Sequence, residues 1–167
     1  IEKHIEDLVL KNNNPFILVA EAPEKPGNIG ALLRTADAAG VDAFIIANLN
    51  TDIFNPNIIR SSVGGVFTKQ VVSGTSMEII TFLKKQKIKI FCATINDSSV
   101  SIYDQDYTGP TALVVGTEST GLREEWVNVA DHNIIIPMQG QLDSVNVSVS
   151  AAIILFEAVR QRMLIKK

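Results

Sequence analysis

The sequence contains a single cysteine and only two histidines among its 167 residues, and this scarcity limits the kinds of site that it can form. Cys92 has no partner for a disulfide within the chain, and it lies in an apolar run where a small buried residue is expected. His4 and His132 do not stand at ligand spacing from each other or from the cysteine. We therefore predict that this protein holds no metal ion.

Long apolar runs and an excess of positive charge are also missing. The longest runs fall far short of the about 18 apolar residues that cross a membrane, and no charged-then-apolar leader opens the sequence. We therefore expect a cytoplasmic protein with no membrane partner. The 15 basic and 18 acidic residues leave a net charge of −3, which argues against nucleic-acid binding by bulk electrostatics. A local basic patch or another domain would have to supply such binding.

What the sequence does contain is an alternation of apolar runs with helical patterns, in a composition that is 46% hydrophobic and typical of one domain with a core. Strands are expected at residues 16–20, 43–46, 66–72, 88–93, 111–115 and 134–136. Helices are expected at residues 28–39, 56–62, 75–87, 122–129 and from 144 onward. Continuous apolar strands that alternate with helices predict an α/β fold with a parallel sheet covered by helices on both faces. Residues 1–14 are expected to form a short polar helix or linker, and residues 15–167 the main domain.

Residues that favour helix ends locate the start of three helices. Asn28 is predicted to cap the first helix, and Thr75 with Glu78 forms a capping box. Residues 144–150 alternate polar residues with valines, which periodicity alone assigns to a strand. They run without a breaker into a segment rich in helix formers, so we predict instead that Ser144 caps a long C-terminal helix. This helix is apolar nearly all round, which predicts burial on more than one side, with a second chain as its cover.

The loops at the carboxyl ends of the strands decide the chemistry, because ligands of parallel sheets bind there. A dinucleotide fold has G-x-G-x-x-G after its first strand, whereas here only Gly27 and Gly30 are present. Residues 116–121 have the glycine spacing of a P-loop, but Leu122 and Arg123 replace the lysine and the hydroxyl residue that bind phosphate and magnesium. No G-x-S-x-G elbow occurs. A nucleotide-binding doubly wound enzyme is therefore disfavoured.

Three segments resemble, in order and spacing, the three motifs of the SpoU/TrmH branch of the SPOUT superfamily. They are residues 28–36 (NIGALLRTA), 114–122 (VVGTESTGL) and 135–148 (IIPMQGQLDSVNVS). The resemblance extends from Phe16 to Arg162. Members of this family are S-adenosylmethionine-dependent RNA 2′-O-ribose methyltransferases. The resemblance thus implies that residues 15–167 form a SPOUT catalytic domain with a C-terminal deep trefoil knot, one of the rare exceptions to unknotted topology.

The resemblance also implies a set of site residues. The positions that match those holding the methyl donor, largely through main-chain groups, are Gly116, Gly121, Ile136, Met138, Val145 and Asn146. The positions that match the catalytic and polar residues are Asn28, Arg34, Glu118, Ser144 and Asn146. Val145 stands where leucine is usual, which is a mild change for a contact made mostly by backbone.

Arg34 is the residue to which the resemblance gives the activation of the ribose hydroxyl. A guanidinium hardly loses its proton, so a second role is also expected, in which Arg34 docks a phosphate and stabilises the developing alkoxide. Its small neighbours Gly30, Ala31 and Ala38 would leave room for a phosphate. The alternative is a surface ion pair with Asp37. For Glu118 the alternative is a solvated loop acid, and for Ser144 a cap, whereas Asn146 among valines is expected to be a buried amide that needs partners.

The function that follows from the resemblance is transfer of a methyl group from S-adenosylmethionine to a ribose 2′-hydroxyl of RNA. A guanosine in 23S-type ribosomal RNA is the expected substrate, and a homodimer through the C-terminal helix and the knot region is the expected assembly. A tRNA 2′-O-methyltransferase is the near alternative. A catalytically silent RNA-binding module of the same fold is the alternative from a different class.

Overall fold

The computed structural model of the protein describes residues 2–117 and 119–165, in which one parallel sheet forms the centre. Every pair of neighbouring strands is parallel, and the strand order is β1-β4-β3-β2-β7-β5-β8-β6. The strands are β1 Lys3–His4, β2 Phe16–Glu21, β3 Ala43–Ala47, β4 Val71–Gly74, β5 Lys89–Ala93, β6 Val100–Ser101, β7 Thr111–Val115 and β8 His132–Ile135. β2 and β7 pair at the middle of the sheet and are buried along their whole length, which is why their sequences are apolar without alternation.

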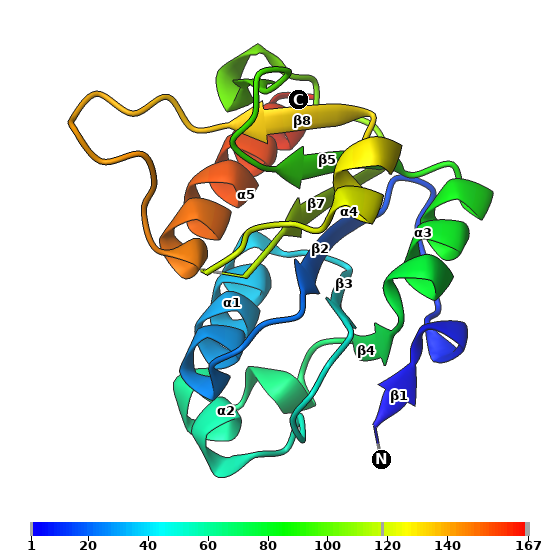
Figure 1. Ribbon diagram of the computed structural model, residues 1–167. Coiled ribbons are helices and arrows are strands. Elements are labelled where there is room, and N and C mark those ends of the chain that lie inside the picture. The colour runs from blue at the N-terminus through cyan, green and yellow to red at the C-terminus, as the bar shows by residue number, and fades with distance from the viewer. Residues whose placement is uncertain (1, 118, 166–167) are drawn as a thin grey trace.

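Helices cover both faces of the sheet, as predicted (Figure 1). They are α1 Pro26–Ala39, α2 Pro56–Ser61, α3 Ser76–Lys85, α4 Glu124–Val129 and α5 Val147–Leu164, with short 3-10 turns η1 Ile5–Asp7, η2 Gly65–Phe67 and η3 Ile102–Asp104. Successive residues of a strand point to opposite faces, so β2 supplies two separate cores. Phe16 and Leu18 pack with α1, α2 and α5, whereas Ile17 and Val19 pack with α3 and α4.

The start of α1 differs from the prediction. The helix begins at Pro26 with Lys25 as its N-cap, so Asn28 is the third helical residue and not the cap. Proline fits the first position of a helix because its fixed φ suits the first turn and no N–H is needed there. The capping box of Thr75 and Glu78 is confirmed, since each residue bonds the backbone N–H of the other.

Two further boundaries were wrong. Residues 66–72 were expected to form the third strand, but the chain makes the turn η2 there and β4 begins only at Val71. Gly64, with φ of 81°, starts this turn by adopting a backbone conformation that few other residues tolerate. Within residues 2–14, β1 pairs with β4, so part of this expected helix or linker is the edge of the sheet. The division into residues 1–14 and 15–167 stays a prediction.

The cap of α5 is Asn146 and not Ser144. The Asn146 side chain accepts a hydrogen bond from the backbone N–H of Ser148 at 2.9 Å, and the helix begins at Val147. Residues 144–146 therefore remain part of the preceding loop. The helical assignment of the valine-rich segment itself is confirmed, because α5 continues for 18 residues.

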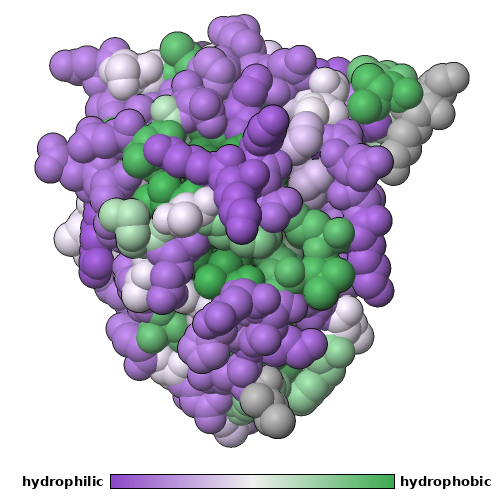
Figure 2. Space-filling model, turned by 90° about the vertical axis from the view of Figure 1, so that its right-hand side faces the viewer, coloured by the Kyte–Doolittle hydropathy of each residue, from purple (hydrophilic) through white to green (hydrophobic). Residues whose placement is uncertain are grey.

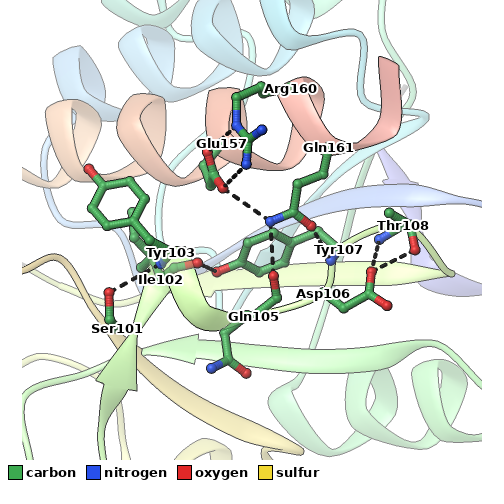
Figure 3. Close-up of polar contacts among 10 residues, drawn as sticks. All are labelled: Ser101, Ile102, Tyr103, Gln105, Asp106, Tyr107, Thr108, Glu157, Arg160 and Gln161. Carbon is green, nitrogen blue, oxygen red and sulfur yellow. Dashed lines mark hydrogen bonds and ion pairs between the residues drawn. The ribbon is translucent and has the colours of Figure 1, made fainter. Parts of the chain in front are cut away.

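Polar contacts anchor the last turns of α5 to the segment before β7 (Figure 3). The Gln161 amide donates to the carbonyl of Gln105 at 2.9 Å and to Glu157 at 3.1 Å, and its oxygen accepts from the Tyr107 N–H at 2.9 Å. The hydroxyl of Tyr107, which is fully buried, donates to the carbonyl of Ile102 at 2.7 Å. These contacts satisfy backbone groups that would otherwise be buried without partners.

The surface has a mixed character. The face along β1, β4 and α3 shows apolar patches between hydrophilic side chains (Figure 2). On α5, one side is buried through Ala151, Ile154, Leu155 and Ala158, whereas Val149 and Phe156 are 47% and 46% exposed. Within the residues that the structure describes, no helix combines the length and the apolar character needed to cross a membrane.

Candidate functional site

A pocket of about 660 Å³ lies at the carboxyl ends of β5, β7 and β8. Its walls are the loop that leaves β7, the loop between β8 and α5, and the first turns of α5. The arrows of these strands in Figure 1 point toward the long loop that precedes α5. The volume lies within the range of small-molecule sites, about 300–1,000 Å³.

The residues predicted to hold the donor all line this pocket. They are Gly116, Gly121, Ile136, Met138, Val145 and Asn146. Ser144, predicted among the catalytic residues, lines it too. Two segments separated by more than ten residues thus converge on one cavity, although the roles of the individual residues stay predictions.

The loop after β7 closes tightly on itself. A Cβ atom built on Gly116 would lie 2.6 Å from the backbone of Gly121 and Leu122, so only glycine fits this position. Thr117 bridges to Gly121, and its hydroxyl oxygen lies 2.8 Å from that of Thr120. The result is a compact loop, of which Gly116, Thr117, Thr120 and Gly121 line the pocket.

Asn146 is explained by its position at the helix start. Sequence reasoning expected a buried amide, but the side chain is exposed, and its oxygen accepts hydrogen bonds from both the N–H and the hydroxyl of Ser148. This prediction was wrong because periodicity does not reveal where the helix begins. As a cap that lines the pocket, Asn146 joins the site to the first turn of α5.

Asn28 and Arg34 differ in their relation to the pocket. Asn28 is partly buried and lines a small adjoining hollow together with Gly116 and Val147. Arg34 is exposed, lies six residues further along α1 and lines none of the pockets described. Six residues advance a helix by about 9 Å, so a substrate that reaches Arg34 has to extend along α1.

The expected alternative for Arg34, an ion pair with Asp37, is not what the structure contains. Asp37 pairs with Lys69, with 3.7 Å between Nζ and the carboxylate oxygen. Gly30 also differs from its expected role, because it is buried against Ser61 of α2 and leaves no room there for a phosphate. Its small size serves helix packing.

Several pocket residues were missed from the sequence, and one predicted residue lies outside the described part of the chain. Glu118, predicted among the catalytic residues, lies outside the described residues. Thr94 and Ile95 line the pocket and directly follow β5, and Asp143 precedes Ser144. Thr94 and Ile95 could have been predicted from the sequence, because they directly follow an expected strand. Across residues 2–117 and 119–165, no cluster of three or more His, Cys, Asp or Glu side chains could hold a metal ion.

Two buried ionisable groups lie near the site. Glu21, the last residue of β2, is 1% exposed, and desolvation by burial raises the pKa of its carboxyl group. Burial, together with the charges of Glu21 and Asp131, raises the pKa of the Cys92 thiol to about 12. Cys92 is therefore a buried neutral thiol, as the sequence predicted, and not a nucleophile.

The fold and the site together define a class. This is a parallel α/β domain whose ligand pocket is closed by a C-terminal helix and lacks a phosphate-binding glycine loop. Residues 15–156 match the SpoU rRNA Methylase family, and the chain belongs to this family.

Two curated relatives show the range of the family. A 23S rRNA (uridine(2479)-2'-O)-methyltransferase of Streptomyces viridochromogenes is 34% identical over 148 residues, which are 86% of this chain and 52% of that protein. A 23S rRNA (guanosine-2'-O-)-methyltransferase, RlmB, of Vibrio parahaemolyticus is 36% identical over 166 residues, which are 99% of this chain and 67% of that protein. The chain thus spans about half of the first relative and about two thirds of the second.

A solved structure extends the likeness to three dimensions. The SpoU methyltransferase AviRb from Streptomyces viridochromogenes in complex with the cofactor AdoMet has a TM-score of 0.89 and 29% sequence identity, over 98% of this chain and 66% of that one. AdoMet is S-adenosylmethionine. The structural matches to this family imply the α/β-knot, which is the fold that the resemblance predicted.

Proposed function

We propose that this protein transfers a methyl group from S-adenosylmethionine to a ribose 2′-hydroxyl of RNA. The observation that supports this most is the convergence of the second and third motif segments on one pocket of about 660 Å³ in a chain of the SpoU family. No other nucleotide-binding signature is present in the sequence.

The pocket suits the donor chemically. Ile136, Met138 and Leu122 provide apolar surface for an adenine ring, and Thr117 and Ser144 provide hydroxyl groups. Asp143 places a carboxylate in the same wall, which can offset positive charge. When bound, S-adenosylmethionine supplies a methyl group on a positively charged sulfur, and the carbon–sulfur bond breaks as the ribose oxygen bonds to the methyl carbon.

The chain's own task is to position the ribose and to stabilise the charge that develops as the hydroxyl gives its proton to water. Positioning of two reactants can account for much of an enzymatic rate, about 7–11 kcal/mol in favourable cases. Arg34 is exposed on α1, the helix whose Asn28 lines the small hollow next to the pocket, so it can bind the RNA backbone. Its fixed positive charge stabilises the alkoxide that forms as the hydroxyl loses its proton.

Ribosomal RNA of the 23S type is the proposed substrate, with guanosine as the methylated nucleotide. The alignment with the RlmB relative covers nearly the whole chain, which favours guanosine over uridine. Such a substrate places the enzyme in the cytoplasm.

A homodimer is the proposed assembly. Val149 and Phe156 are each nearly half exposed on α5, and Leu142 and Val145 in the loop before it are 79% and 40% exposed. Val149 and Phe156 are seven residues apart and so share one face of α5, and Val145 lines the pocket. Burying them against a second copy would remove this surface from water, at about 25 cal/mol for each square ångström.

The test is methyl transfer from isotope-labelled S-adenosylmethionine to unmodified 23S-type rRNA and to tRNA, followed by mapping of the labelled nucleotide. We expect incorporation into a single guanosine 2′-hydroxyl of the rRNA. Calorimetric titration with the donor accompanies the assay. Donor binding without transfer to either RNA identifies a catalytically silent module. Incorporation of label into tRNA but not into rRNA contradicts the proposed substrate.

A further inference from the structure

Glu21 has an unusual position for an acidic residue. Among the residues that the structure describes, it is the only acidic side chain that is fully buried, at 1% exposure. It ends β2 at the carboxyl edge of the sheet, next to the end of β7 where the wall of the pocket begins. Burying a carboxylate costs folding free energy unless the group is paired and hydrogen-bonded.

In the described part of the chain, the polar side-chain contacts of Glu21 are with Arg123, the residue that directly follows the pocket wall. Its Oε2 accepts a hydrogen bond from the backbone N–H of Arg123 at 3.1 Å, and its Oε1 lies 3.3 Å from Nε of the same residue. Oε1 is buried and has no hydrogen bond, although it lies within ion-pair distance of the guanidinium. The pairing of the buried carboxylate is therefore incomplete.

Arg123 connects this carboxylate to the donor pocket. It directly follows Gly121 and Leu122, which line the pocket and pack against Gly116 at the start of the same loop. Arg123 is also the N-cap of α4 and has no side-chain cap bond of its own. Glu21 thus holds the point where the loop ends and α4 begins.

A purely structural anchor does not require a buried charge at this point. A neutral amide accepts the same backbone hydrogen bond, and because the Arg123 side chain is 60% exposed, loss of the carboxylate leaves no buried charge without a partner. Buried and incompletely paired ionisable groups are instead concentrated at functional sites. The cost of the charge is consistent with a role in the reaction rather than in stability.

We propose that Glu21 is a positioning residue for methyl transfer, whose carboxylate fixes the wall formed by residues 116, 117 and 120–122 in the shape that binds the donor. This inference rests on the proposed function, because it assigns a task within the same pocket. Glu21 does not line the pocket, so it acts through Arg123 and Leu122.

The experiment compares Glu21→Gln with the wild type and with Glu124→Gln. The control removes an exposed acid from the first turn of α4, close to Arg123 in sequence. Three quantities are measured: the Kd for S-adenosylmethionine, the melting temperature, and the amide hydrogen exchange of residues 117–123. A charge-assisted contact is worth enough to change affinity about tenfold or more.

We expect Glu21→Gln to weaken donor binding at least about tenfold and to speed amide exchange in the loop, while the melting temperature at neutral pH stays equal or rises. We expect Glu124→Gln to match the wild type in all three. If Glu21 only stabilises the fold, Glu21→Gln should instead lower the melting temperature and leave the Kd of the folded protein unchanged. That result overturns the proposal.

A pH series supplies a second readout. The charged and titratable groups around Glu21 are Arg123, which lowers the pKa of its carboxyl group, and Glu125, which raises it, with the neutral thiol of Cys92 nearby. Because burial raises the pKa of Glu21 in the folded protein, the carboxylate takes up a proton as the pH falls toward the ordinary value of 4.5. Wild-type donor affinity should fall across this range more than that of Glu21→Gln, and equal pH profiles contradict the inference.

Arg123→Ala is a second variant that leaves the carboxylate and the backbone N–H in place. It should weaken donor binding less than Glu21→Gln does, and the double variant should be little worse than Glu21→Gln alone, since the two side chains act as one unit. Additive effects count against the proposal. If the wild type itself binds no donor, the proposed function fails, and the exchange rates of the loop still decide whether Glu21 holds it.

Discussion

Gly30 of α1 lies so close to Ser61 of α2 that a Cβ atom on residue 30 would stand 1.7 Å from the Ser61 hydroxyl oxygen. The backbone nitrogen of Ser62 would also lie within 2.9 Å of it. The two helices therefore meet through glycine at one turn before Arg34. This contact sets how closely α1 approaches α2 next to the arginine.

Gly30→Ala should destabilise the fold. The added methyl group cannot fit without a shift of α2, and such overpacking costs about 1–3 kcal/mol, which lowers the melting temperature of a chain of this size by several degrees. Thermal unfolding checks this. Adding Ser61→Gly to the variant should restore only part of the loss, because the Ser62 backbone remains in the way, and an unchanged melting temperature for Gly30→Ala contradicts the packing described.

Arg34→Ala should abolish methylation with little effect on donor affinity or melting temperature. The side chain is exposed and lines none of the described pockets, so it contributes little packing. We expect single-turnover rates to fall about 100-fold or more, as for the loss of other groups that stabilise developing negative charge.

Arg34→Lys should also lose most of its activity. Lysine keeps the positive charge but lacks the planar fork that can hold a phosphate and the ribose oxygen together. Single-turnover assays with the lysine variant measure this directly. Near-normal turnover in Arg34→Ala would reject the assignment of this residue, whereas activity in the lysine variant alone would show that charge is sufficient.

Cys92 should resist alkylation in the folded protein and react readily once the chain is unfolded. Its pKa rises from 9.0 to about 12 in the fold, so the protonated thiol is favoured by folding. The contribution of this thiol to the free energy of unfolding is fully present below pH 9 and is lost as the pH rises toward 12. Between pH 8 and 11, the free energy of unfolding should fall more steeply for the wild type than for Cys92→Ala. The variant keeps Tyr107, whose pKa is also raised, so the difference between the two proteins reports on the cysteine alone.

Tyr107→Phe should destabilise the segment before β7, against which the last turns of α5 pack. The buried hydroxyl donates to the carbonyl of Ile102, and removing it leaves that carbonyl without this partner at a cost of about 1–3 kcal/mol. Denaturant unfolding measures the loss. Tyr103→Phe is the matched control, because Tyr103 is 55% exposed and its hydroxyl lies outside this network; equal effects of the two changes would contradict the role given to Tyr107.

Phe156→Glu should convert the proposed dimer to a folded monomer. Phe156 is 46% exposed on α5, so a charge there is tolerated by a single chain but not by an apolar interface. Light scattering and circular dichroism separate assembly from folding. Ile154→Glu is the contrasting variant, because Ile154 is 2% exposed and an unpaired charge there should unfold the chain itself. A monomeric wild type at micromolar concentration contradicts the proposal.

The sequence by itself determined the class of fold, the central strands and the family. Strands β2 and β7 are continuous apolar runs because they are buried on both faces, and the capping box of α3 is a local interaction between residues three apart. Both signals are contained in short segments. The motif segments likewise predicted which residues line the pocket, since their order along the chain was enough for the resemblance.

Only the tertiary structure decided the features that depend on residues distant in the chain. The edge strand β1 forms because β4 offers it hydrogen bonds, and Asp37 pairs with Lys69 rather than with its neighbour on α1. Glu21 directly follows the strand that the sequence predicted at residues 16–20, and its burial against Arg123 arises from a contact between residues 102 positions apart. Burial and pairing are properties of the packed chain, so no local pattern could reveal them.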